Sequence, residues 1–169
     1  ARFAATPEAK DEALRTIGNV GRDSLRQMRG VVELLRDAEQ RPLEPATQLD
    51  IDGLVATSRA GGLNVAYTAE GTPPEHLAPA TALTTQRIVQ ESLTNAMKHG
   101  TGRAELAVLW GADNVVVETT NPVAPGATTR PGHGVEGMRQ RAALSGGTVT
   151  ASATPAGTWT TTARIPLNS

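Results

Sequence analysis

The order of the expected helices and strands constrains the fold of this chain more than any other feature of its sequence. Apolar periodicity predicts a helix at 49–59, a strand at 63–69, a helix at 80–99, strands at 103–110 and 114–120, a helix at 135–145, and strands at 146–154 and 158–167. Single strands alternating with helices would indicate a doubly wound parallel sheet, whereas here strands come in adjacent pairs. We therefore expect an α+β arrangement, with helices on one face of an antiparallel or mixed sheet.

Turn and stop signals separate these segments. Gly61-Gly62 is a plausible end for the first helix, and Gly111-Ala112-Asp113 joins the two central strands. The last hairpin turns around Pro155-Ala156-Gly157. Residues 121–131, NPVAPGATTRP, are rich in Pro, Gly and Thr and are expected to form a loop.

The N-terminal segment predicts a long helix over about Pro7–Asp37. It opens with a hydroxyl cap, a proline and an acid at Thr6-Pro7-Glu8. Apolar and small residues repeat every seven positions, at Leu14, Gly21, Met28 and Leu35. This stripe favours packing in a helix bundle, and a helix that covers its own domain is the alternative. Prolines then indicate a linker at 40–47, so we divide the chain into 1–39, the linker, and a second domain at 48–169.

The composition excludes several classes of function. The 169 residues include 16 basic and 17 acidic side chains with a net charge of -1, which lacks the basic excess of a nucleic-acid surface. The absence of cysteine excludes disulfides and thiolate metal sites. No apolar run is long enough to cross a membrane, and no signal-peptide pattern opens the chain. We expect no contact with nucleic acid or membrane.

The stretch Gly132–Met138, GHGVEGM, fits the pattern G-x-G-x-x-G. A dinucleotide fingerprint needs a strand that runs directly into the glycines, whereas these glycines follow a flexible loop. Gly132 and Gly134 would still let the backbone take positive φ and let a phosphate approach the free N–H groups of a helix start. We interpret the stretch as a phosphate-site candidate, and a loop that needs glycine only for its turns is the alternative.

A second constellation lies on the helix that contains QRIVQESLTNAMKHG, residues 86–100. Helical spacing places Glu91, Asn95 and Lys98 or His99 in one narrow stripe. The apolar residues of this segment point the other way. The stripe therefore combines a carboxylate, an amide and basic groups, and an ordinary amphipathic helix with a solvated polar face is the alternative.

At these residues the chain resembles a known family. RIVQESLTNAMKHG is similar to the N-box of sensor histidine kinases, and GHGVEGMRQRAALSGGTV is similar to their glycine box and the helix after it. GTWTTTARIPL resembles the closing strand of the same domain. The likeness is strongest to the subfamily of the nitrate sensors and the lipid-fluidity sensors. It implies an α/β (α+β) two-layer sandwich of the GHKL or Bergerat ATPase type with a mixed sheet, preceded by the second helix of a dimerisation domain.

The resemblance also implies the cofactors ATP and Mg²⁺ and a role for each matching residue. Asn95 would give an amide oxygen to Mg²⁺, and Glu91 would act as the catalytic residue beside the transferring phosphoryl group. The remaining nucleotide contacts would come from Lys98, His99, Asn121, Gly132, His133, Gly134, Gly137 and Thr158. Among these, Thr158 would lie at the floor of the adenine pocket with a bridging water. The loop 122–131 would be part of a lid over the nucleotide.

Two features depart from the family pattern. Asn121-Pro122 stands where the family has an aspartate that accepts the adenine amino group, and a neutral hydrogen bond is roughly half as strong as a charge-assisted one. A turn asparagine before proline is the alternative. The chain has 3 histidines, His76, His99 and His133, and none resembles a phosphoacceptor histidine. We expect the phosphoacceptor helix to precede residue 1 and this chain to be unable to phosphorylate itself on histidine.

The leading hypothesis is the catalytic, ATP-binding part of a sensor histidine kinase. Its parent would phosphorylate its own histidine as a homodimer and pass the phosphoryl group to an aspartate of a response regulator with a LuxR-type DNA-binding domain. The expected location is cytoplasmic, as a free protein or as the cytoplasmic part of a membrane-bound sensor. Two alternatives stay open: a degenerate kinase used for dimerisation or docking, and another GHKL-type kinase, such as an anti-sigma-factor serine kinase.

Overall fold

A computed structural model describes residues 49–124 and 132–167 of the chain. The chain divides into two units, residues 1–42 and 43–169, and all the described residues belong to the second. The expected N-terminal helix, the linker at 40–47 and the lid residues at 125–131 lie outside the described residues. Within the described part, no helix is long and apolar enough to cross a membrane.

The described residues form a mixed sheet with helices on one face, as the element order predicts. In chain order the elements are α2 (Ile51–Ala60), β1 (Asn64–Glu70), α3 (Pro79–His99), β2 (Arg103–Trp110), β3 (Asn114–Pro122), α4 (His133–Leu144), β4 (Thr148–Ala153) and β5 (Thr158–Pro166). The 5-stranded sheet has the order β1-β2-β3-β5-β4. The β1–β2 pair is parallel, whereas the other pairs are antiparallel.

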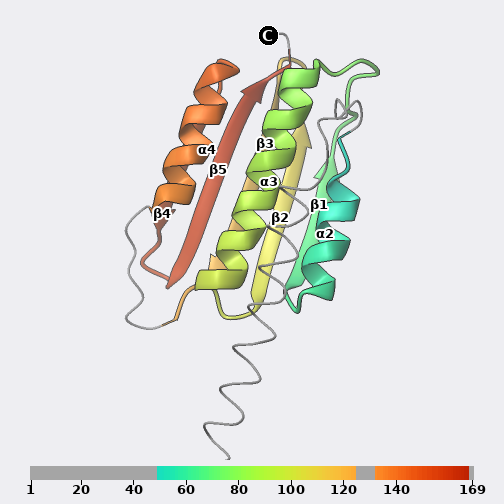
Figure 1. Cartoon of the computed structure of the whole chain (residues 1–169). Helices are drawn as coiled ribbons and strands as arrows, with labels where there is room; N and C mark the ends of the chain where they lie inside the picture. The colour runs from blue at the N-terminus through green and yellow to red at the C-terminus, as the bar shows by residue number, and fades with distance from the viewer. Residues whose placement is uncertain (1–48, 125–131, 168–169) are drawn as a thin grey trace, which may run out of the picture. The chain divides into compact units, whose positions relative to one another are not determined.

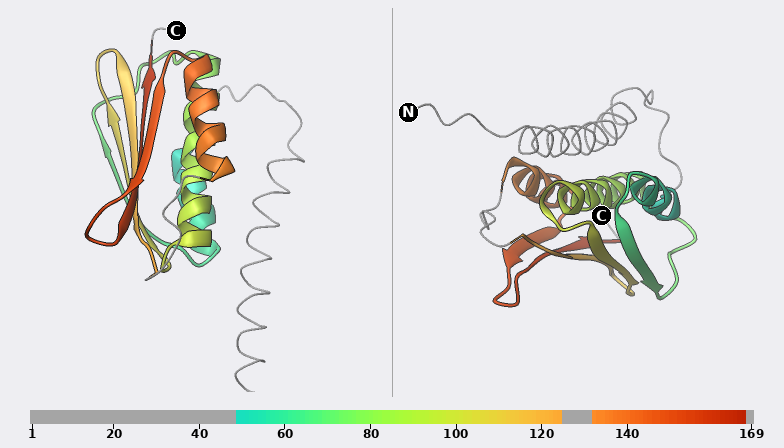
Figure 2. Two further views of the ribbon diagram at one scale, coloured as in Figure 1. Left: turned by 90° about the vertical axis from the view of Figure 1, so that its left-hand side faces the viewer. Right: turned by 90° about the horizontal axis from the view of Figure 1, so that it is seen from below.

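The helices lie side by side across one face of the sheet, in the order α4, α3, α2 (Figure 1). Figure 2 shows that no described element covers the opposite face. The central helix α3 packs on β2, β3 and β5, while α4 packs on β4 and β5 and α2 on β1. The two-layer α+β fold is therefore confirmed.

The core between the layers consists of small and aliphatic side chains. Ile88, Val89 and Ala96 of α3 are fully buried between the layers. Val115 of β3 and Ile165 of β5 are fully buried as well. A strand places alternate residues on opposite faces, so every second residue of β3 and β5 faces this core. That parity decides which polar side chains near the strand ends face the helices.

The ends of α3 follow from local chemistry. Pro79 lies in the first turn, where its missing N–H costs no hydrogen bond. The helix ends at Gly100, whose N–H donates to the carbonyl of Ala96 at 2.9 Å. Lys98 and His99 occupy the last turn, where positive charge suits the helix dipole.

Most element boundaries lie within two residues of the expectation, and the differences beside the expected loop at 121–131 bear on the site. Asn121 and Pro122 belong to β3 rather than to a loop, because Asn121 pairs with Trp159 and Pro122 pairs with Thr158 of β5. Helix α4 begins at His133, two residues before the apolar pattern that predicts it. The loop between them is therefore shorter at both ends than the sequence indicates.

Candidate nucleotide-binding site

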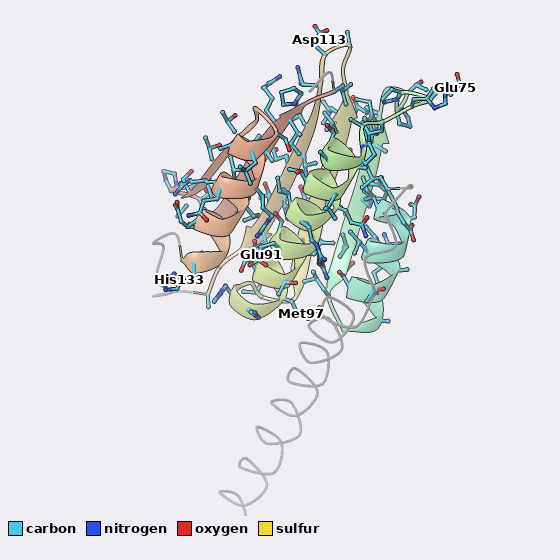
Figure 3. All side chains as sticks on the ribbon, turned by 45° about the horizontal axis from the view of Figure 1, so that its top comes forward. Glu75, Glu91, Met97, Asp113 and His133 are labelled. Carbon is cyan, nitrogen blue, oxygen red and sulfur yellow. The ribbon has the colours of Figure 1, made fainter. Side chains whose placement is uncertain are left out.

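A cavity of about 570 Å³ lies at the end of the helical layer where α4 begins. Its lining combines residues from α3, from the start of α4, and from the paired ends of β3 and β5. These residues are Glu91, Asn95, Lys98, His99, Asn121, Gly132, His133, Gly134, Val135 and Trp159. Figure 3 shows Glu91 on α3 and His133 at the start of α4, both at this end of the domain. The structure thus brings together most of the residues that the two sequence motifs predict.

The polar stripe of α3 forms one wall of the cavity. Glu91 and Asn95 are half-buried, whereas Lys98 and His99 are exposed at its mouth. The opposite face of the helix holds the buried Leu93, so the helix cannot rotate the stripe away without exposing its core face. An acidic and an amide oxygen are therefore held within a turn of each other, with basic side chains toward solvent.

The start of α4 forms the second wall. Gly132 is the N-cap, so no side chain caps the first N–H groups of α4. Its carbonyl accepts from the N–H groups of Val135 at 3.1 Å and Glu136 at 3.3 Å. The first N–H groups of a helix, here those of His133 and Gly134, have no partner inside the helix. Together with the helix dipole, these N–H groups favour an anion at the cavity.

Gly134 is required by a close approach between helices rather than by a positive φ. An added Cβ at Gly134 would collide with Glu91 Oε1 and would lie 3.2 Å from Glu91 Cδ and 3.3 Å from Asn95 Nδ2. Neither Gly132 nor Gly134 has a positive φ, so the expected left-handed backbone is wrong. Within residues 49–124 and 132–167, a Cβ added at Gly132 would meet no atom within 4 Å, and one at Gly137 would meet only the Arg141 guanidinium, at 3.3 Å.

Asn121 closes the inner end of the cavity. Its side chain is buried, and its Nδ2 donates to the Pro122 carbonyl at 3.2 Å. A carbonyl oxygen only accepts, so this contact identifies the nitrogen of the amide and leaves the oxygen and a second N–H for other partners. Two residues earlier on the same face, the buried Oγ1 of Thr119 has no hydrogen-bond partner among the described residues.

The structure does not bring two of the predicted residues to the cavity. Thr158 faces the open side of the sheet, where it lines a separate hollow of about 240 Å³ and shares a 2.7 Å hydrogen bond with Thr154. Gly137 lies one turn into α4 and does not line the cavity. Trp159, the next residue along β5, lines the cavity instead, and the sequence patterns did not identify it. Counting back in steps of two from the core residue Ile165 would have identified Trp159 as inward-facing.

The donors around the cavity fit a magnesium nucleotide. Its volume lies within the range of about 300–1,000 Å³ that is typical of small-molecule sites. Glu91 and Asn95 offer the oxygen ligands that Mg²⁺ prefers, and the helix start offers N–H groups for phosphate. No group of three or more His, Cys, Asp or Glu side chains that could hold a metal alone occurs in the described residues. A cation here would therefore be shared between few protein ligands and its anion, as is usual for Mg²⁺.

Comparisons with known proteins agree with this fold. The chain is 28% identical over 151 residues to the sensor histidine kinase YxjM of Bacillus subtilis, a match that covers 88% of this chain and 36% of that protein. Among solved structures, the histidine kinase domain of the blue-light activated histidine kinase of Erythrobacter litoralis has a TM-score of 0.51 at 17% identity, covering 97% of this chain and 89% of that one. The histidine kinase AdeS of Acinetobacter baumannii has a TM-score of 0.53 at 12% identity, covering 99% and 88%.

These likenesses establish the fold as that of histidine kinase catalytic domains. The sequence match adds support for a histidine kinase ATPase domain, although the chain spans only 36% of the curated relative's length. No protein-family model matches the chain.

Proposed function

We propose that this chain contains the ATP-binding catalytic domain of a sensor histidine kinase. The observation that carries the proposal is the cavity, in which a carboxylate, an amide and a helix N-terminus from separate motifs line one space. The parent protein would phosphorylate its own histidine and pass the phosphoryl group to an aspartate of a response regulator. The likeness to a sensor histidine kinase supports this assignment.

Each wall of the cavity has a distinct role in this proposal. Asn95 supplies an amide oxygen to Mg²⁺, and Glu91 orients or deprotonates the group that attacks the γ-phosphate. The N–H groups of His133 and Gly134 contact phosphate, while Lys98 and His99 add positive or hydrogen-bonding groups at the mouth. Mg²⁺ supplies charge neutralisation when bound. Phosphoryl transfer asks mainly for such positioning and neutralisation.

We also propose finer assignments that rest on the motif resemblance. The sequence of the α3 and α4 segments favours the subfamily of nitrate and lipid-fluidity sensors, whose partners are regulators with LuxR-type DNA-binding domains. The heptad stripe at 1–39 favours a homodimer of the full protein. The family resemblance favours a cytoplasmic location for this domain.

Calorimetric titration with ADP and a non-hydrolysable ATP analogue, with and without Mg²⁺, tests the proposal. Asn95→Ala should abolish the dependence of affinity on Mg²⁺. Asn114→Ala is the matched control. Asn114 lies at the end of β3 opposite to the cavity residue Asn121, and its Oδ1 accepts from Arg164 Nη1 at 2.9 Å. Two results would contradict the role of Asn95 as a Mg²⁺ ligand. One is a nucleotide affinity of the unaltered protein that does not depend on Mg²⁺, and the other is an equal change of affinity in both variants.

A degenerate kinase used as a docking module is the second candidate, and Asn121 favours it. A buried amide replaces the expected carboxylate, and one of its N–H groups already donates to Pro122. This candidate predicts no nucleotide binding at millimolar concentration. Measurable Mg²⁺-dependent binding would exclude it.

A further inference from the structure

We infer that Trp159 is the stacking platform for the nucleobase, so that base recognition in this chain rests on an aromatic face where the resembled family uses a carboxylate. The inference rests on the proposed nucleotide site and names the residue that determines its base affinity. Among the described residues that line the cavity, Trp159 has the largest aromatic ring, and the two other aromatic rings are the smaller imidazoles of His99 and His133. The chain as a whole is 2% aromatic, with 2 tryptophans.

Strand pairing places Trp159 beside Asn121. The two residues are direct partners across the antiparallel β3–β5 pair, and directly opposed residues project to the same face of a sheet with Cβ atoms about 4.5–5.5 Å apart. Both line the cavity. A ligand that hydrogen-bonds the Asn121 amide therefore lies within reach of the indole.

The indole is held in place by its own polar edge. Trp159 Nε1 donates to Thr161 Oγ1 at 3.1 Å, which fixes the ring along the strand. This bond satisfies the one polar group of the side chain and leaves its apolar face for contact. Because Trp159 is half-buried and packs against the core, stacking requires little additional ordering of its side chain.

The other cavity residues near Trp159 contribute little binding energy for a nucleobase. Asn121 is neutral, and a hydrogen bond between neutral groups contributes about 0.5–1.5 kcal/mol. Val135 is the other large apolar side chain at the cavity, and it is already buried. Stacking of a base on an aromatic side chain tolerates any base, since every base has a π-face. Trp159 should therefore provide most of the affinity for the base, with purines, which have the larger stacking area, bound best.

Tryptophan fluorescence tests the inference in a variant whose cavity residues are unchanged and in a second variant that lacks Trp159. The other tryptophan, Trp110, pairs with Val115, six positions before Asn121 on β3, or about 20 Å along the strand. In Trp110→Phe protein, Mg²⁺–ADP should quench the remaining fluorescence, and Mg²⁺–tripolyphosphate, which has no base, should not. In Trp159→Phe protein, Mg²⁺–ADP should leave the remaining fluorescence unchanged.

Calorimetry of two further variants measures the contribution of the ring. Trp159→Leu should bind Mg²⁺–ADP about five- to hundredfold more weakly while its affinity for Mg²⁺–tripolyphosphate stays within about twofold. Trp159→Phe should retain most of the affinity for the nucleotide. Thermal unfolding confirms that each variant is folded.

The outcomes separate this inference from the proposed function. Unchanged Mg²⁺–ADP affinity in Trp159→Leu, or binding without quenching in Trp110→Phe, overturns the role of Trp159 and leaves the nucleotide site standing. Equal losses for nucleotide and tripolyphosphate would show a structural role instead and also overturn the inference. A protein that binds neither ligand overturns both proposals.

Discussion

Replacement of Gly134 by alanine should separate stability from nucleotide binding. The added Cβ would collide with Glu91 Oε1, which is the far end of a flexible side chain. The carboxylate can therefore move aside without displacing backbone. The fold should survive, while the geometry at the expected metal and phosphoryl end of the cavity should not.

The magnitudes follow from the contacts. Glu91 Cδ would lie 3.2 Å from the new Cβ, and carbon atoms prefer about 3.5–4.0 Å, so the carboxylate must shift by roughly 0.3–0.8 Å. The same Cβ would lie 3.3 Å from Nδ2 of Asn95, the residue that we propose as the Mg²⁺ ligand. Because Mg²⁺ tolerates little deviation from octahedral geometry, we expect Mg²⁺–ADP affinity to fall about tenfold, or about 1.4 kcal/mol. Alanine is a better helix former than glycine by up to about 1 kcal/mol, so the melting temperature should stay level or rise by about 2–4 °C.

Gly132→Ala is the matched control. No atom of the described residues lies within 4 Å of an added Cβ there, and the φ of -92° suits alanine. Gly132 is the N-cap, where alanine is less favourable than glycine by about 0.5–1 kcal/mol. This variant should therefore lose a little stability and keep its affinity, the opposite pattern to Gly134→Ala.

Calorimetry with Mg²⁺–ADP and thermal unfolding of both variants measure the two patterns. Equal affinities of Gly134→Ala and Gly132→Ala for Mg²⁺–ADP would refute the argument that Gly134 makes room for Glu91. A melting temperature of Gly134→Ala well below the unaltered value would show instead that the collision reaches the backbone.

Three further substitutions test the fold and its electrostatics. Leu93→Ala, at a side chain 1% exposed, should lower the free energy of unfolding by about 2–5 kcal/mol in urea titrations, whereas Leu83→Ala, at a side chain 44% exposed, should change it by less than about 1 kcal/mol. Asp50→Ala removes the side-chain cap of α2 and should cost about 1 kcal/mol in the same assay, most of which Asp50→Ser should restore. Burial, and secondarily the Asp52 charge, raises the pKa of Tyr67, the only tyrosine, so an absorbance titration should find its midpoint above the ordinary value and Asp52→Asn should lower that midpoint. Because this pKa is higher in the folded chain, its contribution to stability is complete below the unfolded pKa and is lost as the pH rises through the folded pKa, a dependence that Tyr67→Phe should remove.

Hydrophobic periodicity was sufficient to predict most of the fold. Strand β2 covers the predicted residues 103–110, and α3 differs from the predicted 80–99 by one residue, because both segments bury a regular apolar face. The order of elements also indicated helices on one face of an antiparallel or mixed sheet. The strand order could not be read from the sequence, because the pairing of β1 with β2 and of β3 with β5 depends on contacts between distant segments.

The site was less predictable where tertiary pairing overrides local signals. Asn121-Pro122 reads as a turn, yet Asn121 pairs with Trp159 in the sheet, and Pro is tolerated at the end of a strand. The family pattern pointed to Thr158, but the parity of β5 turns Thr158 outward and Trp159 inward. A glycine pattern likewise does not distinguish a positive φ from a close approach, and Gly134 proved to be the second kind.

Gly100 links the end of α3 to the end of β3. A Cβ at Gly100 would lie 2.9 Å from Asn121 Nδ2 and would collide with the Ala96 carbonyl of α3. The next residue, Thr101, donates its N–H to the Pro122 carbonyl at 3.2 Å, the same oxygen that accepts from Asn121. The end of α3 and the end of β3 therefore share one acceptor and one glycine contact. Because of this link, the α3 residues proposed to face Mg²⁺ and the β3 amide proposed to contact the base are positioned by a common backbone junction. The close contacts explain why α3 is followed by a glycine here although its φ, -88°, is not positive.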